Sequence, residues 1–314
     1  MTPHQHFASA PQPDPAQIPA DQRYVIYRWL SNDDFLLNKV VPDATNIEAA
    51  VDDDLEAVIT RIPADAACFH FHLNCTLTSL FPPARNELIA FLRKRKIAAI
   101  NASLTDISKR TIQRRCRELG LSTTAAARTG DGDELIIVKT DLNFGGDSEW
   151  ALTPGDRATL GIGAGSTHMW KANDYQVLAR KDIEESWWSD QSLVTEKYIG
   201  NKEEKWYRAV LLFDRIVLRE LVNPTQIKKV GQSVVTRQWS LDASDERTFG
   251  DSPANLVRDL ITFSRAFSMD FGAIDIMVDD AEEPFIIDVN STPALHIAQP
   301  LLVEHLRGAL TTTT

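Results

Sequence analysis

Residues 271–295 read FGAIDIMVDDAEEPFIIDVNSTPAL, and they carry the clearest pattern in the chain. Two apolar runs, 272–278 and 285–289, flank an acidic connection that ends in a proline. Strand-like runs joined by a short polar connection are typical of a β-hairpin. We therefore expect two antiparallel strands here, joined by a loop over residues 279–284.

The predicted hairpin brings three oxygen-bearing side chains together. With that loop, Val278 faces Phe285, and the same register sets Asp275 opposite Asp288. Asn290 shares a face with Asp288, because side chains alternate along a strand. Two opposed carboxylates destabilise a sheet unless a cation lies between them, and carboxylate and amide oxygens suit Mg²⁺. The hairpin is either a metal site or a sheet with a solvated acidic face, and the rest of the chain must separate the two.

Composition limits the classes of function. The 314-residue chain is 43% hydrophobic and 25% charged, as in a soluble globular protein of two or three domains. Its net charge of −11 argues against nucleic acid or an anionic membrane as the main partner, because both require concentrated Lys and Arg. The sequence has no membrane-length apolar run and no signal-peptide pattern at its N-terminus. We therefore expect a cytoplasmic protein.

The cysteines and histidines give no metal signature. Cys68, Cys75 and Cys116 lack metal-site spacing, so we expect reduced thiols. His70 and His72 alternate with apolar residues, which favours a strand with its polar face outward over a metal cluster.

The N-terminal third alternates strand-like and helix-like segments after a tail, residues 1–21, whose composition predicts disorder. Alternation of this kind predicts a parallel sheet, so residues 22–103 are interpreted as a small α/β domain. The strand candidates are Tyr24–Leu30, Ala67–Leu73 and Ile97–Ile100, and the helix candidates are 47–59 and 86–96.

A lysine followed by a glycine pair marks the middle of the chain. The apolar strand predicted over Leu135–Val138 ends on Lys139, and Gly145 and Gly146 follow it. Such a lysine can supply charge to nucleotide phosphates, and the glycines let backbone N–H groups approach them. The lysine precedes the glycines, so this is not a Walker A loop. A second glycine-rich stretch, 161–165, lacks a dinucleotide fingerprint and is predicted to be a flexible loop.

The remaining elements place a further arginine, Arg208, on a strand. Helices are predicted from N-cap and proline signals, and strands from apolar runs. The predicted helices cover residues 105–119, 253–268 and 295–310, and the first is capped by Thr105, Asp106 or Ser108. The predicted strands are 193–199 and a hairpin of 207–213 with 216–218, which contains Arg208.

In chain order, residues 100–295 resemble the signature of the ATP-grasp family, which includes D-alanine–D-alanine ligase and glutathione synthetase. Lys109 resembles the first phosphate-contacting basic residue, and Lys139 resembles the strand-end lysine on ATP. Residues 143–147, with Gly145 and Gly146, resemble the glycine-rich lid loop.

The resemblance continues into a nucleotide-binding hinge. Glu196, Lys197, Tyr198 and Ile199 resemble the segment whose backbone binds adenine. Glu203 stands where the family has the acid that holds the ribose hydroxyls.

Arg208 resembles the arginine that contacts phosphate and the acyl group, and Asp275, Asp288 and Asn290 resemble the metal triad. The family more often has glutamate where Asp288 stands, and a shorter carboxylate can still bind Mg²⁺. Ala294 replaces a glycine that usually follows the proline in the next loop. Because these matches occur in the order of the family, the resemblance favours a metal site in the hairpin over a solvated acidic face.

The resemblance implies an α/β protein with the ATP-grasp fold. Residues 22–103 would form the N-terminal α/β domain, and residues 104–198 a connecting helix with the lid subdomain. Residues 199–314 would form a catalytic subdomain built on a mixed sheet, with ATP bound between the two subdomains.

The resemblance also implies an ATP-dependent carboxylate–amine ligase that forms an acyl phosphate and releases ADP and phosphate. Lys139 and Arg208 would be catalytic, and the cofactors would be ATP with one or two Mg²⁺ ions, or Mn²⁺. Expected substrates are a small carboxylate and an amine, such as an amino acid or short peptide, and a homodimer is expected on the same family ground. The alternatives are a small-molecule kinase and a nucleotide-binding protein without turnover.

Overall fold

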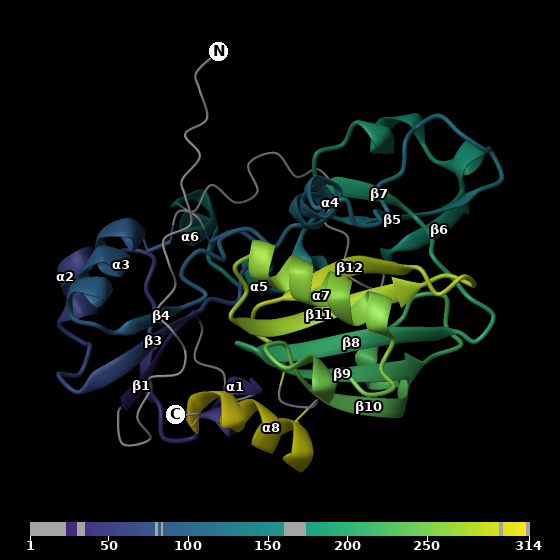
Figure 1. Ribbon diagram of the computed structural model, residues 1–314. Helices are drawn as coiled ribbons and strands as arrows, with labels where there is room; N and C mark the ends of the chain where they lie inside the picture. The colour runs from purple at the N-terminus through teal and green to yellow at the C-terminus, as the bar shows by residue number, and fades with distance from the viewer. Residues whose placement is uncertain are drawn as a thin grey trace.

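The computed structural model describes residues 23–29, 35–78, 81–82, 84–159, 174–294 and 298–311. The predicted tail and the glycine-rich stretch 161–165 lie outside these ranges. Within them the chain forms three β-sheets with helices packed on them (Figure 1). None of the helices in these ranges is long and apolar enough to cross a bilayer.

The first sheet, which we name the N-terminal sheet, is parallel throughout its described strands, as the alternation of strands and helices predicts. Its strands lie in the order β2-β1-β3-β4. They are β1 (Arg23–Arg28), β2 (Thr45–Glu48), β3 (Ala66–His72) and β4 (Ala98–Ile100). The accompanying helices are α1 (Leu37–Val40), α2 (Leu55–Ile59) and α3 (Arg85–Lys94).

The helix predicted over residues 47–59 is wrong in its first half. Ile47 lies in β2, opposite Tyr27 of β1. Helix α2 begins only after Asp54, whose side chain accepts a hydrogen bond from the Ala57 amide. An N-cap of this kind satisfies a free N–H group and sets the start of the helix.

The middle sheet is a small antiparallel sheet that follows helix α4 (Lys109–Glu118). Ser108, one of the three predicted N-cap residues, caps α4, because its side chain accepts a hydrogen bond from the Thr111 amide. The sheet has the order β6-β5-β7, with β5 (Leu135–Thr140), β6 (Gln176–Ala179) and β7 (Leu193–Lys197). Short helices connect these strands: η2 (Asn143–Gly146), α5 (Asp147–Trp150), α6 (Pro154–Thr159), η4 (Arg180–Asp182) and η5 (Glu185–Trp188).

The C-terminal sheet has the order β10-β9-β8-β11-β12, and each described pair is antiparallel. Parallel and antiparallel pairing are therefore both present in the fold, but in different sheets. The strands are β8 (Lys205–Leu212), β9 (Arg215–Val222), β10 (Val234–Asp242), β11 (Phe271–Val278) and β12 (Pro284–Asn290). The helices are η6 (Val230–Gln232), η7 (Glu246–Thr248), α7 (Ala254–Ala266) and α8 (Pro300–Thr311).

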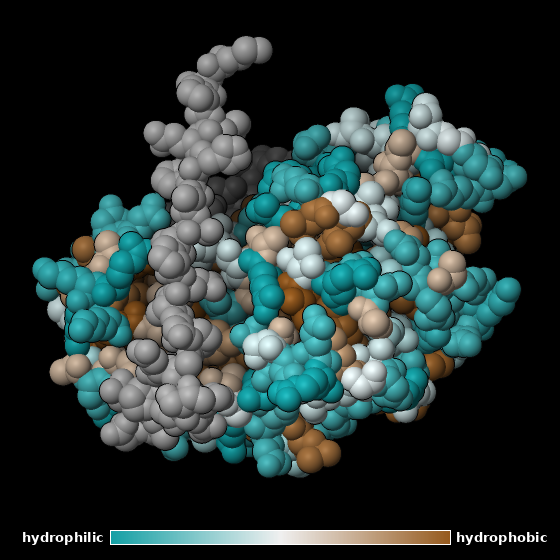
Figure 2. Space-filling view, in the orientation of Figure 1, coloured by the Kyte–Doolittle hydropathy of each residue, from teal (hydrophilic) through white to brown (hydrophobic). Residues whose placement is uncertain are grey.

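The two faces of the C-terminal sheet pack against different partners (Figure 1). On one face, Ile274 and Ala209 pack with Leu260 of α7 and with α4 in one apolar core. On the other face, Phe271 and Val210 share a second core with α8 and the N-terminal sheet. The outer surface in the view of Figure 2 is mostly hydrophilic, with apolar side chains in small groups.

The β11–β12 hairpin forms as predicted, but its register near the turn differs by one residue. Val278 pairs with Pro284, and not with Phe285. Asp275 nevertheless pairs with Asp288, because the register shifts between Asp275 and its neighbour Ile276. This irregularity is a β-bulge, in which one strand carries an extra residue. The bulge restores the carboxylate pair that the sequence predicts.

The prediction that His70 and His72 face solvent is wrong. Both side chains are completely buried, because the N-terminal sheet packs on the C-terminal sheet through this face of β3. His70 accepts or donates a 2.8 Å hydrogen bond with the Tyr24 hydroxyl, and both histidine rings contact Phe271. Asn101 joins the same two sheets, because its side chain accepts hydrogen bonds from the Asp270 and Phe271 amides.

Burial of His70 predicts a loss of stability in acid. Burial lowers the pKa of His70 from 6.5 to about 3, so the unfolded state binds the proton more readily between these values. Stability is therefore fully present above pH 6.5 and falls as the pH decreases, by about 1.4 kcal/mol per pH unit for one such histidine. Urea unfolding at several pH values should give a shallower dependence for His70→Phe, and an unchanged dependence would contradict the prediction.

Candidate active site

A row of polar side chains crosses the C-terminal sheet. Asp288, Asp275, Arg208, Arg219 and Gln238 are direct register partners on β12, β11, β8, β9 and β10. Directly opposed residues point to the same face, with their Cβ atoms about 5 Å apart. The strand pairing therefore assembles one continuous polar row from residues that are distant in the sequence.

Apolar side chains lie on both sides of the polar row. On one side of the row, along the strands, Trp206, Leu221 and Met277 form a small apolar cluster with Ile199 and Ile287. In the other direction the same sheet face is covered by the N-terminal sheet and α8. The polar row therefore lies beside the apolar cluster, where the packing of the second core ends.

Arg208 and Asp275 form the ion pair at the centre of the row. The Arg208 Nη1 atom donates to both carboxylate oxygens of Asp275, at 2.8 and 2.9 Å. Burial raises the pKa of Asp275 to about 6, although Arg208 lowers it, and Asp288 raises it further. The Arg208 Nε atom is buried without a hydrogen-bond partner among the described residues. This site therefore contains a carboxylate that is costly to ionise and a guanidinium with an unused donor.

The three predicted metal ligands lie at one edge of the sheet. The Oδ1 atom of Asp288 is buried and has no hydrogen-bond partner within the described ranges, and the Lys109 ammonium is 4.0 Å away. The Asn290 Oδ1 atom accepts a hydrogen bond from the Thr292 amide at 2.8 Å. No group of three or more His, Cys, Asp or Glu side chains in the described part of the chain could hold a metal. The set of Asp275, Asp288 and Asn290 is not such a group, because its third ligand is the side-chain amide of Asn290.

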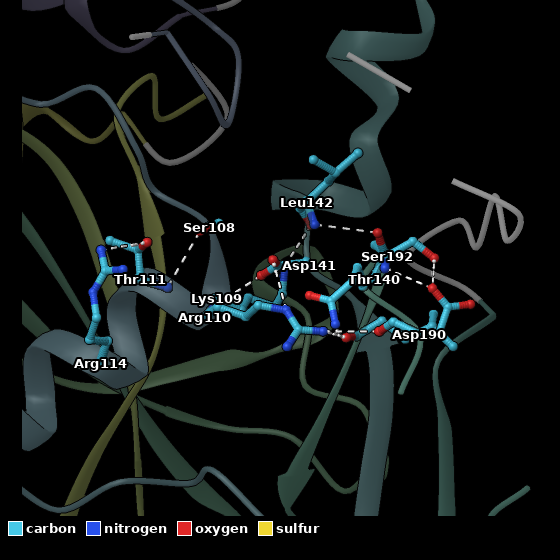
Figure 3. Close-up of polar contacts among 12 residues, drawn as sticks. Ser108, Lys109, Arg110, Thr111, Arg114, Thr140, Asp141, Leu142, Asp190 and Ser192 are labelled. Carbon is cyan, nitrogen blue, oxygen red and sulfur yellow. Dashed lines mark hydrogen bonds and ion pairs between the residues drawn. The ribbon is translucent and has the colours of Figure 1, made fainter. Parts of the chain in front are cut away.

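Lys109 lies in the first turn of α4, next to Asp141 and Leu142 (Figure 3). Its ammonium donates to the Leu142 carbonyl at 2.6 Å, and its amide donates to the Asp141 carbonyl. Arg110 also binds Asp141, whose carboxylate accepts from the Arg110 amide at 2.9 Å. These contacts fix the start of α4 to the segment that follows β5. Lys109 is consequently buried next to Asp288.

Lys139 and Glu196 form a buried ion pair on the middle sheet. The Lys139 Nζ atom lies 2.6 Å from Glu196 Oε2, and both side chains are buried. The second carboxylate oxygen, Oε1, is also buried and lacks a hydrogen-bond partner among the described residues. Lys139 is close enough to Asp275 to lower the pKa of that carboxyl, so the ion pair lies within electrostatic range of the polar row.

The predicted hinge residues are held partly by the chain itself. The Lys197 amide donates to the Thr124 carbonyl, and the Tyr198 amide donates to the Leu135 carbonyl. A base bound here would therefore use the hinge carbonyls or Ile199, which packs on the apolar cluster.

Glu203, predicted to hold a ribose, lies at the surface. Its carboxylate is 2.9 Å from the Lys205 ammonium, which also binds Glu282. The structure therefore does not gather Glu203 with the buried residues of the polar row.

The glycine pair has a left-handed backbone conformation. Gly145 and Gly146 have positive φ values of 73° and 80°, and Phe144 has a φ of 47°. A Cβ atom at Gly146 would lie 2.7 Å from the Leu142 side chain. Both the backbone conformation and the close packing therefore require glycine at position 146.

Arg219 is a site residue that the strand register places next to Arg208. Its guanidinium donates to the side-chain carbonyls of Gln238 and Gln299, at 2.8 and 3.0 Å. Burial lowers the pKa of Arg219, and the neighbouring Arg208 lowers it further. Arg237 and Trp239, the neighbours of Gln238 on β10, are not in the row. Arg237 binds Asp251 at the surface and lies over the Trp239 ring.

Tyr175 is a residue near the site that no sequence signal indicated. Burial raises its pKa, Asp288 raises it further, and Lys139 lowers it. The Gly145 amide also hydrogen-bonds to the tyrosine. Tyr175 therefore lies next to Gly145 and within electrostatic range of Asp288.

Comparison with known proteins identifies the fold. No protein-family model matches the sequence, and no curated protein matches it. A RiPP-associated ATP-grasp ligase from Chryseobacterium gregarium, solved with ADP and a leader and core peptide, is 11% identical over 92% of this chain and 96% of that chain, with a TM-score of 0.50. The chain has the ATP-grasp fold.

Other ATP-grasp structures are similar over comparable lengths. The D-alanine–D-alanine ligase of Bacillus anthracis is 12% identical, covers 92% of both chains and gives a TM-score of 0.46. The macrocyclase MdnC of Microcystis aeruginosa, bound with its precursor peptide, is 12% identical over 91% of this chain and 98% of that chain, with a TM-score of 0.47. The similarity to the ligase from Chryseobacterium gregarium confirms the expected ATP-grasp fold.

Proposed function

We propose that this chain is an ATP-dependent ligase that joins a carboxylate to an amine through an acyl phosphate. The polar row carries the proposal, because it places two carboxylates beside two buried arginines on one sheet face. Phosphoryl transfer depends mainly on positioning and on charge neutralisation, with little covalent help from the protein. A pair of carboxylates followed by a pair of arginines suits that task, because the first can bind a cation and the second can neutralise anionic groups.

The donor set fits a hard divalent cation. Asp275 and Asp288 oppose each other directly, one with a raised pKa and the other with a buried oxygen that lacks a partner among the described residues. Asp275, Asp288 and Asn290 would hold Mg²⁺, which would offset the negative charge of the nucleotide phosphates.

The middle sheet supports a nucleotide beside the row. The Glu196 Oε1 atom, which has no hydrogen-bond partner among the described residues, suits a donor such as the exocyclic amine of adenine. The partly buried Ile199 and Ile287 offer an apolar surface for the ring. Lys139 and Lys109 would bind the phosphates, together with backbone N–H groups of residues 143–147.

Arg208 and Arg219 would bind the acid substrate. Guanidinium groups match carboxylate and phosphate oxygens in a fixed fork geometry. Arg208 would contact the acyl phosphate and the oxyanion that forms when the amine attacks. Arg219, farther along the row, would bind the substrate carboxylate of an amino acid or short peptide.

A phosphate-release assay tests the function. Purified protein is incubated with Mg·ATP and pools of amino acids and short peptides, and the products are identified by mass spectrometry. A ligase releases ADP and phosphate and forms an amide, whereas a kinase leaves the phosphate on its product. Nucleotide binding without either product in any pool would contradict the proposal.

Arg219→Gln is expected to raise the KM for the acid substrate about 10- to 100-fold, because it removes one charge-assisted contact. The KM for ATP should change little, since Arg219 lies two strands away from Asp275. Initial-rate kinetics measure both constants. Arg237→Gln, at the surface of the next strand, is the matched control and should behave as the wild type. An unchanged acid KM in Arg219→Gln would remove Arg219 from the substrate site.

A further inference from the structure

The segment Leu73–Thr76, at the carboxyl end of β3, contacts two separate parts of the proposed site. The Thr292 hydroxyl donates to Asn74 Oδ1 at 2.8 Å, and the Thr292 amide donates to the predicted metal ligand Asn290. Ligands of α/β sheets bind at the carboxyl ends of parallel strands. This segment therefore lies beside the metal-ligand edge of the polar row.

Thr76, the last residue of that segment, also holds the glycine loop, which we define as residues 143–147. The Asn143 amide donates to Thr76 Oγ1 at 2.9 Å. The Thr76 amide in turn donates to Glu149 Oε1 at 2.5 Å. The Thr76 and Glu149 side chains are almost completely buried, each with 1% of its surface exposed. One threonine thus binds the chain on both sides of the glycine pair.

Neighbouring contacts fix Thr76 itself. Its carbonyl accepts from the Ile107 amide at 2.9 Å, just before the cap of α4. Leu152, beyond the glycine loop, is buried in the same apolar core as Phe71 and Leu73 of the N-terminal sheet. The N-terminal sheet therefore provides a rigid support for a loop whose glycines have little conformational preference of their own.

We propose that Thr76 and Glu149 are positioning residues that hold the glycine loop over the polar row and exclude water from the acyl phosphate. The inference rests on the proposed ligase function. In productive turnover the amine attacks the acyl carbon, forms the C–N bond and expels phosphate. If water attacks instead, a C–O bond forms, phosphate leaves and the original acid returns, so one ATP is consumed without an amide.

The first test measures coupling, defined as phosphate released per amide formed. Thr76→Val keeps the shape and the backbone amide but removes the hydroxyl acceptor of Asn143. We expect it to raise phosphate release per amide by about tenfold, as solvent access to an intermediate increases. Thr76→Ser retains the hydroxyl and should restore coupling. Thr78→Val is the matched control, because the Thr78 hydroxyl is directed at the Leu104 and Thr105 carbonyls and not at the glycine loop.

The second test does not require substrate. Hydrogen exchange of peptides that cover residues 143–149 should be faster in Thr76→Val and Glu149→Ala than in the wild type or Thr78→Val. If exchange accelerates but no acid supports turnover of the wild type, the loop contact stands and the ligase proposal fails. Unchanged exchange in both variants would overturn the loop contact. Faster exchange with unchanged coupling in an active enzyme would overturn the role in water exclusion.

Discussion

Asp288→Ala is expected to reduce turnover about a thousandfold or more, since loss of a ligand to a catalytic cation removes several kcal/mol of charge stabilisation. Asp288 contributes the buried Oδ1 atom that has no partner within the described ranges. It is also the direct register partner of Asp275. Phosphate release at saturating ATP and acid, with and without Mg²⁺, measures the effect.

The stability of Asp288→Ala separates a functional role from a structural one. Asp288 raises the pKa of Asp275, so its removal relieves repulsion in the folded state. This gain offsets the loss of the carboxylate beside the buried Lys109 ammonium, so the variant should unfold at a temperature close to that of the wild type. Asp280→Ala, in the exposed turn of the same hairpin, is the control and should remain active. A tenfold loss of turnover corresponds to about 1.4 kcal/mol in the activation barrier. If Asp288→Ala loses less than this, the metal-ligand assignment is contradicted.

The hairpin shows how far sequence reasoning reaches. Alternating apolar residues predict both strands, and the pairing of Asp275 with Asp288 is correct. The turn pairing is wrong by one residue, and the error is cancelled by the bulge. A one-residue slip reverses the faces of a strand, and no local signal in residues 284–290 reveals which position carries the extra residue.

Contacts between distant elements account for most of what the sequence did not predict. The pattern of His70 and His72 indicates a strand but not what covers it, and the covering residue Phe271 is about 200 positions away. Likewise, the sequence predicts Lys139 as a phosphate-binding residue but gives no reason to pair it with Glu196. That contact depends on the order of strands in the middle sheet.

Arg219 illustrates the same limit within the site. A single arginine on a strand is more often a surface residue, and its face is known only when the register is known. Once β9 pairs with β8, Arg219 lies beside Arg208 on the buried face. The predicted arginine was identified by resemblance, whereas its neighbour is identified by geometry.

Arg208→Lys is expected to lower kcat about 100- to 1,000-fold, the loss that follows removal of one preorganised oxyanion donor. The KM for ATP should change only slightly. Arg208 pairs with Asp275 through Nη1, and its Nε and Nη2 atoms remain available as donors to a substrate. A lysine keeps the positive charge opposite Asp275, but its single ammonium cannot provide these additional donors in a fixed geometry. Steady-state kinetics with the acid identified in the phosphate-release assay measure kcat and KM separately.

The lysine substitution discriminates between two roles of Arg208. If Arg208 only neutralises Asp275, the retained charge suffices, and Arg208→Lys should lose less than about threefold in kcat, under 1 kcal/mol of barrier. If Arg208 stabilises the acyl phosphate and the oxyanion, the fork geometry is essential and the large loss appears with unchanged thermal stability. Arg237→Lys controls for the chemistry of the substitution, because Arg237 binds Asp251 at the surface of the same sheet. A small effect in Arg208→Lys would leave charge balance at Asp275 as its function and would assign the oxyanion contact to another residue, with Arg219 as the first candidate.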